Sequence, residues 1–201
     1  MNKIICIFLF LVFISFVNSR EKFLKSENKF YAIDTTKKYC HQFKKLSSAE
    51  KYFRSANNRT KECRFDSVAK VVAAKEYGLA VALNPSFWQA RRNYARQLTY
   101  LKQYKLAIEQ LNKALKIVSY KENPDLIFMR GLAYYENGNF QKAIADFDIA
   151  IKYQGNIEFT LLAKAKAQWK IGNIEIACEN YHKSISLAPH LSERKEFILC
   201  N

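Results

Sequence analysis

The sequence predicts an all-α fold, a solenoid of antiparallel helix pairs, and a repeated segment is the first observation that does so. The residues YKLAIEQLNKAL at 104–115 recur as FQKAIADFDIAI at 140–151. Fainter copies begin near residues 70 and 174, and each copy carries one fixed alanine: Ala73, Ala107, Ala143 and Ala177. These alanines are 34, 36 and 34 residues apart, a period typical of solenoids built from short structural repeats.

Two further observations support the helix pairs. Each alanine is followed four residues later by a bulky side chain and three residues after that by a small one, the spacing of one helix face. Asn137-Gly138-Asn139 and Gly172-Asn173 precede the last two copies, and such residues favour the left-handed backbone at a helix end. Each copy is therefore the second helix of a pair.

Residues 1–19, MNKIICIFLFLVFISFVNS, predict a secretory signal peptide. They contain one early lysine, an apolar run over 4–17, and small residues at the cleavage spacing. The run is shorter than the roughly 20 residues that span a bilayer, although an uncleaved anchor is an alternative. We therefore expect an exported protein, periplasmic or extracellular.

Residues 20–46 form a polar, Lys-rich leader, and the positive charge of the chain is concentrated near it. The formal net charge is +15, and residues 20–64 carry 13 basic against 5 acidic side chains. Such a surface suits an acidic partner or an anionic membrane or envelope surface. Export argues against nucleic acid as a partner. A plain solvated lysine surface is the alternative.

Four cysteines follow the predicted signal peptide: Cys40, Cys63, Cys178 and Cys200. An even number in an exported chain indicates disulfides. Because only neighbouring units touch in a solenoid, the reachable pairs are Cys40–Cys63 and Cys178–Cys200. A metal site from Cys178, His182, His190 and Cys200 is an alternative, but its spacing matches no standard zinc pattern.

Residues 47–85 predict a degenerate first helical pair. Ser48 opens a helix to about Ala56, where Asn57-Asn58 should break it. Asp66 caps a second helix that runs through Leu83. Three clearer units then follow at 86–119, 124–157 and 158–189, with a C-terminal cap at 190–201.

Residues 85–189 resemble the tetratricopeptide repeat family. Small residues occupy the place in each first helix where two helices touch: Ala95, Gly131 and Ala165. Apolar residues open each second helix: Tyr104, Phe140 and Ile174. Pro85 and Pro189 end their units. The resemblance implies a right-handed superhelix whose concave face is lined by the first helix of each pair.

The residues contain no recognisable catalytic constellation. The three histidines have no nucleophile at a known spacing, and the chain has neither a Gly-rich phosphate loop nor a Cys-x-x-Cys pair. We therefore expect no enzyme, no cofactor and no metal, but a protein-interaction scaffold. A structural or envelope-associated protein that binds an anionic surface is the alternative.

The resemblance also implies a partner-binding groove, lined by residues of the first helices that internal packing does not need. These are Arg92, Arg96, Tyr100, Phe128, Leu132, Tyr135, Leu162, Lys166 and Trp169. The groove would take a protein or peptide partner, with Trp169 as the leading anchor. The alternative is that these aromatic residues are ordinary core.

Overall fold

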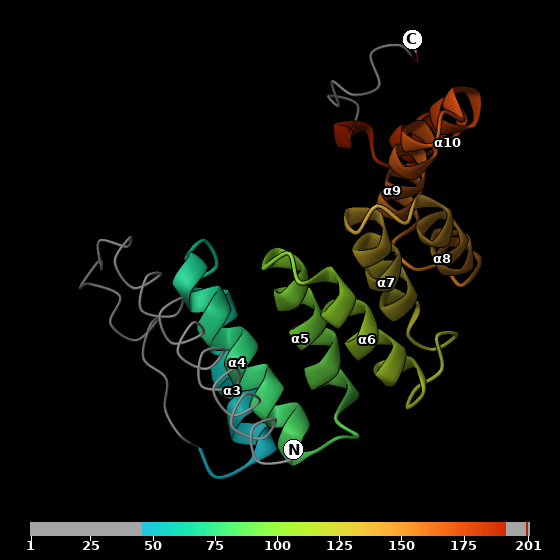
Figure 1. The fold of residues 1–201 in the computed structure, drawn as a ribbon. Coiled ribbons are helices and arrows are strands. Elements are labelled where there is room, and N and C mark those ends of the chain that lie inside the picture. The colour runs from blue at the N-terminus through green and yellow to red at the C-terminus, as the bar shows by residue number, and fades with distance from the viewer. Residues whose placement is uncertain (1–45, 192–199, 201) are drawn as a thin grey trace, which may run out of the picture. The chain divides into compact units, whose positions relative to one another are not determined.

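The computed structural model describes residues 46–191 and Cys200, which belong to one compact unit spanning Tyr39–Asn201. The signal peptide, the leader, Cys40 and most of the C-terminal cap lie outside the described residues. Within them the regular elements, shown in Figure 1, are α3 (Ala49–Glu62), α4 (Ser67–Leu83), α5 (Trp88–Tyr100), α6 (Tyr104–Leu115), α7 (Pro124–Glu136), α8 (Phe140–Lys152), α9 (Ile157–Lys170), α10 (Ile174–Leu187) and the 3-10 helix η2 (Pro189–Leu191).

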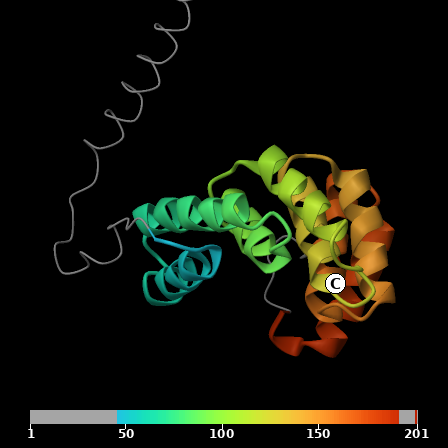
Figure 2. The same cartoon turned by 90° about the horizontal axis from the view of Figure 1, so that it is seen from below.

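Each helix packs against the next one along the chain, as the second view also shows (Figure 2). Contacts also join α5 to α7 and α7 to α9, so the first helices of successive pairs form a row. No strand occurs in residues 46–191. The prediction of an all-α solenoid of antiparallel helix pairs is confirmed.

The repeated residues are the core of each pair. In α8, Ala143, Phe147 and Ala150 are fully buried, and the matching residues of α4, α6 and α10 are buried as well. Gly131 of α7 faces Phe147, and a Cβ atom added to this glycine would lie 2.6 Å from the Phe147 ring. The small residue is therefore needed for the close approach of α7 and α8.

A tight backbone turn separates the two helices of each of the last three pairs. Gly138 and Gly172 adopt φ values of 77° and 84°, the left-handed region that glycine favours. In the earlier turn, Lys102 occupies the same region at φ 59°, and Gln103 N donates to Leu98 O over 2.8 Å. The same helix-ending motif thus forms there without a glycine, at the strain cost of a left-handed lysine.

The predicted break at Asn57-Asn58 is wrong, because α3 continues through both residues to Glu62. The Asn57 side chain faces its neighbouring helices instead. Its Oδ1 accepts hydrogen bonds from Tyr77 Oη at 2.7 Å and from Asn93 Nδ2 at 2.9 Å. Contacts with α4 and α5 therefore outweigh the weak helix propensity of asparagine. The predicted cap is present, since Asp66 Oδ1 accepts from the backbone of Val68 at 2.8 Å.

One disulfide joins Cys178 of α10 to Cys200, with the two Cα atoms 5.2 Å apart. The bond occupies both thiols that the alternative metal site would need. His182 Nε2 also lies 2.8 Å from Cys200 O, so Cys200 is held to α10 at two points. Cys63 is disulfide-bonded too, and its predicted partner Cys40 lies outside the described residues.

No helix in residues 46–191 is both long enough and apolar enough to span a bilayer.

Candidate partner-binding groove

Helix α5 is anchored through one face. The Arg91 guanidinium donates to Pro85 O from Nε and Nη2, at 2.9 and 2.7 Å, and to Gln110 Oε1 from Nη1 at 2.8 Å. Burial lowers the pKa of Arg91 and raises the pKa of Tyr94 on the same helix. These contacts fix α5 against the preceding loop and α6.

The face of α5 that lies away from these contacts carries Arg92, Arg96 and Tyr100, spaced one helical turn apart. Tyr100 is 60 % exposed, Arg96 is exposed and Arg92 is half-buried. Arg92 lies 5.9 Å from the centre of the Trp88 ring, and neither arginine forms an ion pair with a carboxylate in the described part of the chain. Two uncompensated cations and an exposed aromatic ring therefore lie in one row.

A hollow of about 360 Å³ lies between α5 and α7. Its lining residues are Arg92, Arg96, Thr99, Tyr100, Asp125, Phe128, Met129, Leu132 and Asn156. Five of the nine residues that the sequence predicts for the groove are thus brought together here. We call this site the α5–α7 hollow.

The α5–α7 hollow combines an apolar floor with a basic edge. Phe128, Met129 and Leu132 of α7 supply the floor, and all three are only partly buried. Asp125 at the start of α7 accepts a hydrogen bond from Asn156 Nδ2 at 2.9 Å. This contact links α7 to the turn before α9 and supplies a hydrogen-bond donor to the only acidic residue in the lining. The arrangement suits an apolar side chain with negatively charged neighbours.

The other four predicted residues lie outside the α5–α7 hollow. Leu162 was expected to line the groove, but it is only 6 % exposed and packs with Ala165 and Tyr181, so it is a core residue. Trp169 packs against the same cluster. Trp169 is partly buried at the edge of this cluster and is not among the residues that line the hollow.

Tyr135 and Lys166 are half-buried. The Tyr135 ring packs edge-on against Phe140, with the ring centres 5.5 Å apart, beside the cluster that contains Phe147. These contacts link α7 to α8. Tyr135 therefore contributes to packing between the two helices of its own pair.

Sequence reasoning missed Thr99, Asp125, Met129 and Asn156. Asp125 and Met129 lie on the same side of α7 as Phe128 and Leu132, at spacings of three and four residues, so helical periodicity could have identified them. Asn156 could not have been found in this way. It precedes α9 with a left-handed backbone, at φ 40°, and reaches the hollow only because the helix pairs stack.

Residues 124–157 match the family model described as tetratricopeptide repeat. A crystal structure of MamA is similar in fold, with a TM-score of 0.61 at 15 % identity over 73 % of this chain and 81 % of that one. MamA residues 41-end from Desulfovibrio magneticus give 0.54 at 17 % identity, over 71 % and 86 %.

The C-terminal part of a TPR repeat-containing protein from Cytophaga hutchinsonii gives a TM-score of 0.55 at 19 % identity, over 78 % of this chain and 56 % of that one. At these identities the likeness shows a shared fold. No curated protein matches the sequence. The repeat match and the stacked helix pairs agree on the architecture.

Proposed function

We propose that this chain, in which residues 124–157 match the tetratricopeptide repeat family, is a non-catalytic scaffold that binds a segment of a partner protein in the α5–α7 hollow. One observation carries the proposal. The apolar floor of Phe128, Met129 and Leu132 is accessible beside two cations that no described carboxylate pairs. Apolar surface in a concave site with a charged rim is typical of a binding surface rather than of solvated helix.

The bound segment would place an apolar side chain on the α7 floor and acidic groups near Arg92 and Arg96. Burial of the apolar anchor would supply most of the affinity, because a few central contacts dominate most interfaces. The arginines at the edge would mainly accelerate association and set its salt dependence.

We place this interaction outside the cytoplasm, in the periplasm or the extracellular space. The basis is the predicted signal peptide at residues 1–19. N-terminal sequencing of the protein recovered from its native host should begin at or near Arg20. Recovery of a chain that still starts at Met1 and partitions with membranes would favour the retained-anchor alternative.

An envelope-associated role is the second candidate, and the excess of basic residues over 20–64 supports it. Salt separates the two. Electrostatic screening shortens to about 8 Å at physiological ionic strength, so attachment through charge alone should be lost as salt increases. Binding of an apolar segment in the α5–α7 hollow should largely persist.

The test is a pull-down at low and moderate salt with the wild-type protein and two variants of the hollow, Tyr100→Ala and Leu132→Gln. We expect each variant to weaken the free energy of binding to the specific partner by about 2 kcal/mol, since central aromatic and aliphatic contacts carry such energies. The pull-down should show this as reduced retention. Circular dichroism should show an unchanged helix content.

Tyr120→Ala is the matched control, because Tyr120 is an exposed tyrosine outside the hollow. Retention that survives Tyr100→Ala and Leu132→Gln, or that falls equally with Tyr120→Ala, would contradict the proposal. Trp169→Ala provides a second comparison. This variant should lower the melting temperature, because Trp169 packs against the core cluster that contains Leu162 and Tyr181. Partner binding should persist.

A further inference from the structure

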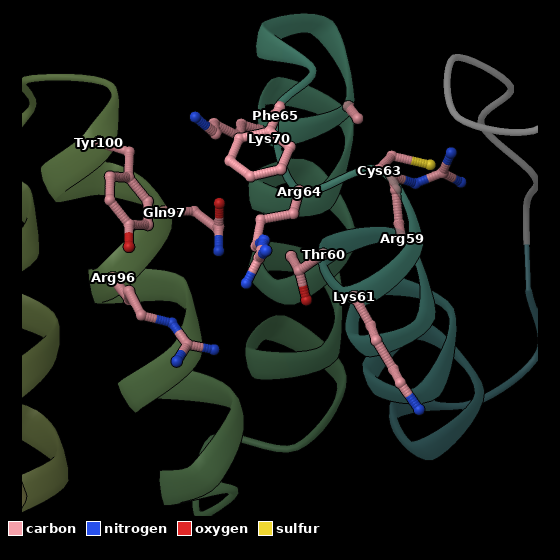
Figure 3. A pocket seen from close by; sticks show the side chains of 11 residues that line it. Arg59, Thr60, Lys61, Cys63, Arg64, Phe65, Lys70, Arg96, Gln97 and Tyr100 are labelled. Carbon is pink, nitrogen blue, oxygen red and sulfur yellow. The ribbon is translucent and has the colours of Figure 1, made fainter. Parts of the chain in front are cut away.

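A second, larger cleft of about 700 Å³ lies between the end of α3, the start of α4 and the last turns of α5 (Figure 3). Besides Arg59, which pairs with Glu76, its lining includes four cationic side chains: Lys61, Arg64, Lys70 and Arg96. No aspartate or glutamate of the described chain lines it. We call this site the basic cleft.

The four cations of the basic cleft have no carboxylate partner within the described residues. Arg64 lies 4.7 Å from the centre of the Phe65 ring, and Lys70 lies 5.2 Å from that of Tyr100. Mutual repulsion of four unpaired cations around one space is unfavourable, and an anion with several negative charges would relieve it. This charge pattern therefore favours the binding of a multivalent anion.

A second observation, independent of charge, concerns Gln97. This side chain is only 3 % exposed, yet its Oε1 accepts no hydrogen bond from any described residue. Figure 3 shows the Gln97 amide extending from α5 into the basic cleft, between Tyr100 and Arg96. A buried acceptor without a donor is unfavourable, so a ligand here gains by donating a hydrogen bond from an O–H or N–H group.

Two aromatic rings complete the basic cleft. Phe65 is 85 % exposed and Tyr100 is 60 % exposed, which is unusual for rings of this size. Both line the cleft beside the cations. They offer flat apolar surfaces on which a ring-shaped ligand can pack.

We infer that the basic cleft binds a phosphorylated sugar. Each phosphate carries about 1.5 to 2 negative charges near neutral pH and accepts hydrogen bonds from Arg64, Arg96 and Lys70. A sugar hydroxyl donates to Gln97 Oε1, and the apolar face of the sugar ring packs on Phe65 or Tyr100. A carboxylate group supplies charge without the donor. Inorganic phosphate supplies charge and an O–H group but no ring to pack on Phe65 or Tyr100, and a neutral sugar supplies the donor and the ring without charge.

The same chemistry has two sources, a free sugar phosphate or the phosphorylated headgroup of a membrane lipid. The inference does not depend on the scaffold proposal. The basic cleft shares Arg96 and Tyr100 with the α5–α7 hollow, whereas Arg64, Lys70 and Gln97 line only the cleft and Leu132 lines only the hollow.

Calorimetric titration of the purified protein with fructose 1,6-bisphosphate tests the inference. We expect this probe to bind at least about tenfold more tightly than inorganic phosphate, which lacks the ring and its hydroxyl groups, and fructose not to bind measurably. Arg64→Gln combined with Lys70→Gln should weaken binding by roughly a hundredfold, because two charged hydrogen bonds are lost. The charge-matched control is Lys105→Gln with Lys116→Gln, two exposed lysines of the α6 segment outside the cleft.

Gln97→Leu separates a ligand role from a structural one. The leucine removes the unpaired acceptor at similar volume, so the melting temperature should hold or rise, while bisphosphate affinity falls about tenfold. Leu132→Gln, which should impair the scaffold function, should leave bisphosphate binding unchanged. The two proposals can therefore fail independently: bisphosphate binding tests the basic cleft, and retention of a protein partner tests the α5–α7 hollow.

Vesicles distinguish the two sources. Retention on phosphatidylcholine vesicles that contain phosphatidylinositol 4-phosphate, reversed by soluble bisphosphate, assigns the lipid headgroup. No retention, with soluble binding intact, assigns a free sugar phosphate.

Four outcomes would overturn the inference. These are equal affinity for inorganic phosphate, equal or tighter binding of a glutamate-rich peptide, tighter binding of a mixed-sequence oligonucleotide, and an equal loss in the α6 control.

Discussion

The Arg59 guanidinium and the Glu76 carboxylate form an ion pair inside the first helix pair. Arg59 Nη2 lies 2.9 Å from Glu76 Oε1, and Nε lies 3.1 Å from Oε2. Ser55 Oγ donates a third hydrogen bond to Oε1 at 2.9 Å. Both charged residues are almost completely buried, at 2 % and 0 % exposure. Where the repeat pattern is weakest, α3 and α4 are thus joined by a buried polar contact.

Removing one partner of this pair should destabilise the protein strongly. Glu76→Leu leaves the Arg59 charge buried without its carboxylate, which typically costs about 3–5 kcal/mol. Urea unfolding followed by circular dichroism measures the change. Lys113→Met, which breaks the half-exposed pair with Glu109, should cost at most about 1 kcal/mol.

The double variant Arg59→Met/Glu76→Leu should recover most of the loss, because well-packed apolar residues often replace a buried pair without penalty. A Glu76→Leu variant as stable as the wild type would show that the pair contributes nothing. A double variant no better than Glu76→Leu would show that other contacts of Arg59 carry the effect.

Gly131→Ala should destabilise the protein by roughly 1–3 kcal/mol. The added Cβ atom would meet the Phe147 ring at 2.6 Å, and Phe147 is fully buried, so the ring cannot move without disturbing the core. Thermal unfolding measures the loss.

Gly78→Ala is the control for that change. A Cβ atom there would lie 3.4 Å from Tyr94, an ordinary contact, and alanine is the better helix former by about 1 kcal/mol. Gly78→Ala should therefore leave stability unchanged or raise it. If Gly131→Ala did the same, the close contact of α7 and α8 would not depend on glycine.

Loss of the Cys178–Cys200 disulfide should lower the free energy of unfolding by about 3 kcal/mol, the chain-entropy value for a loop of this length. The double variant Cys178→Ser/Cys200→Ser and a reduced wild-type protein should agree. Non-reducing peptide mapping should recover this bond and, as the sequence predicts, a second one between Cys40 and Cys63. Recovery of Cys63 bonded to any other cysteine would refute that second pairing.

Stability should fall as the pH rises above 10. Burial raises the pKa of Tyr77 above its ordinary value of 10.0, so the folded protein holds the phenol proton more tightly than the unfolded chain does. The resulting stabilisation is complete below pH 10 and is lost as the pH rises through the folded pKa. Urea unfolding between pH 8 and pH 11 measures this slope.

Tyr77→Phe should make that slope shallower. At pH 8 it should also cost about 1 kcal/mol, because the hydrogen bond to Asn57 Oδ1 disappears. Burial raises the pKa of Tyr94 as well, so part of the slope should remain. Tyr120→Phe changes an exposed tyrosine and should alter neither quantity. An unchanged slope in Tyr77→Phe would exclude Tyr77 as its source.

Periodicity within single helices was sufficient to predict the repeat architecture and much of the core. The fixed alanines and the bulky residues that follow them are buried, because a side chain at a given place on a helix faces the same neighbour in every unit. Gly131 was predicted as a contact residue from the family resemblance, and its close approach to Phe147 agrees with that prediction. Five of the nine residues that line the α5–α7 hollow were predicted from the resemblance to the tetratricopeptide repeat family, which places the first helix of each pair on the concave face.

Only the tertiary structure decided what lies between units. It continues α3 through Asn57, whose side chain bonds to α4 and α5, and it buries Leu162 among residues of α10. It also brings Arg64 to the same cleft as Arg96, which lies on another pair. Helical periodicity indicates the face of a helix on which a side chain lies. Whether that side chain is buried or paired with a charge depends on which distant segment covers the face. The stacking of the helix pairs determines that segment.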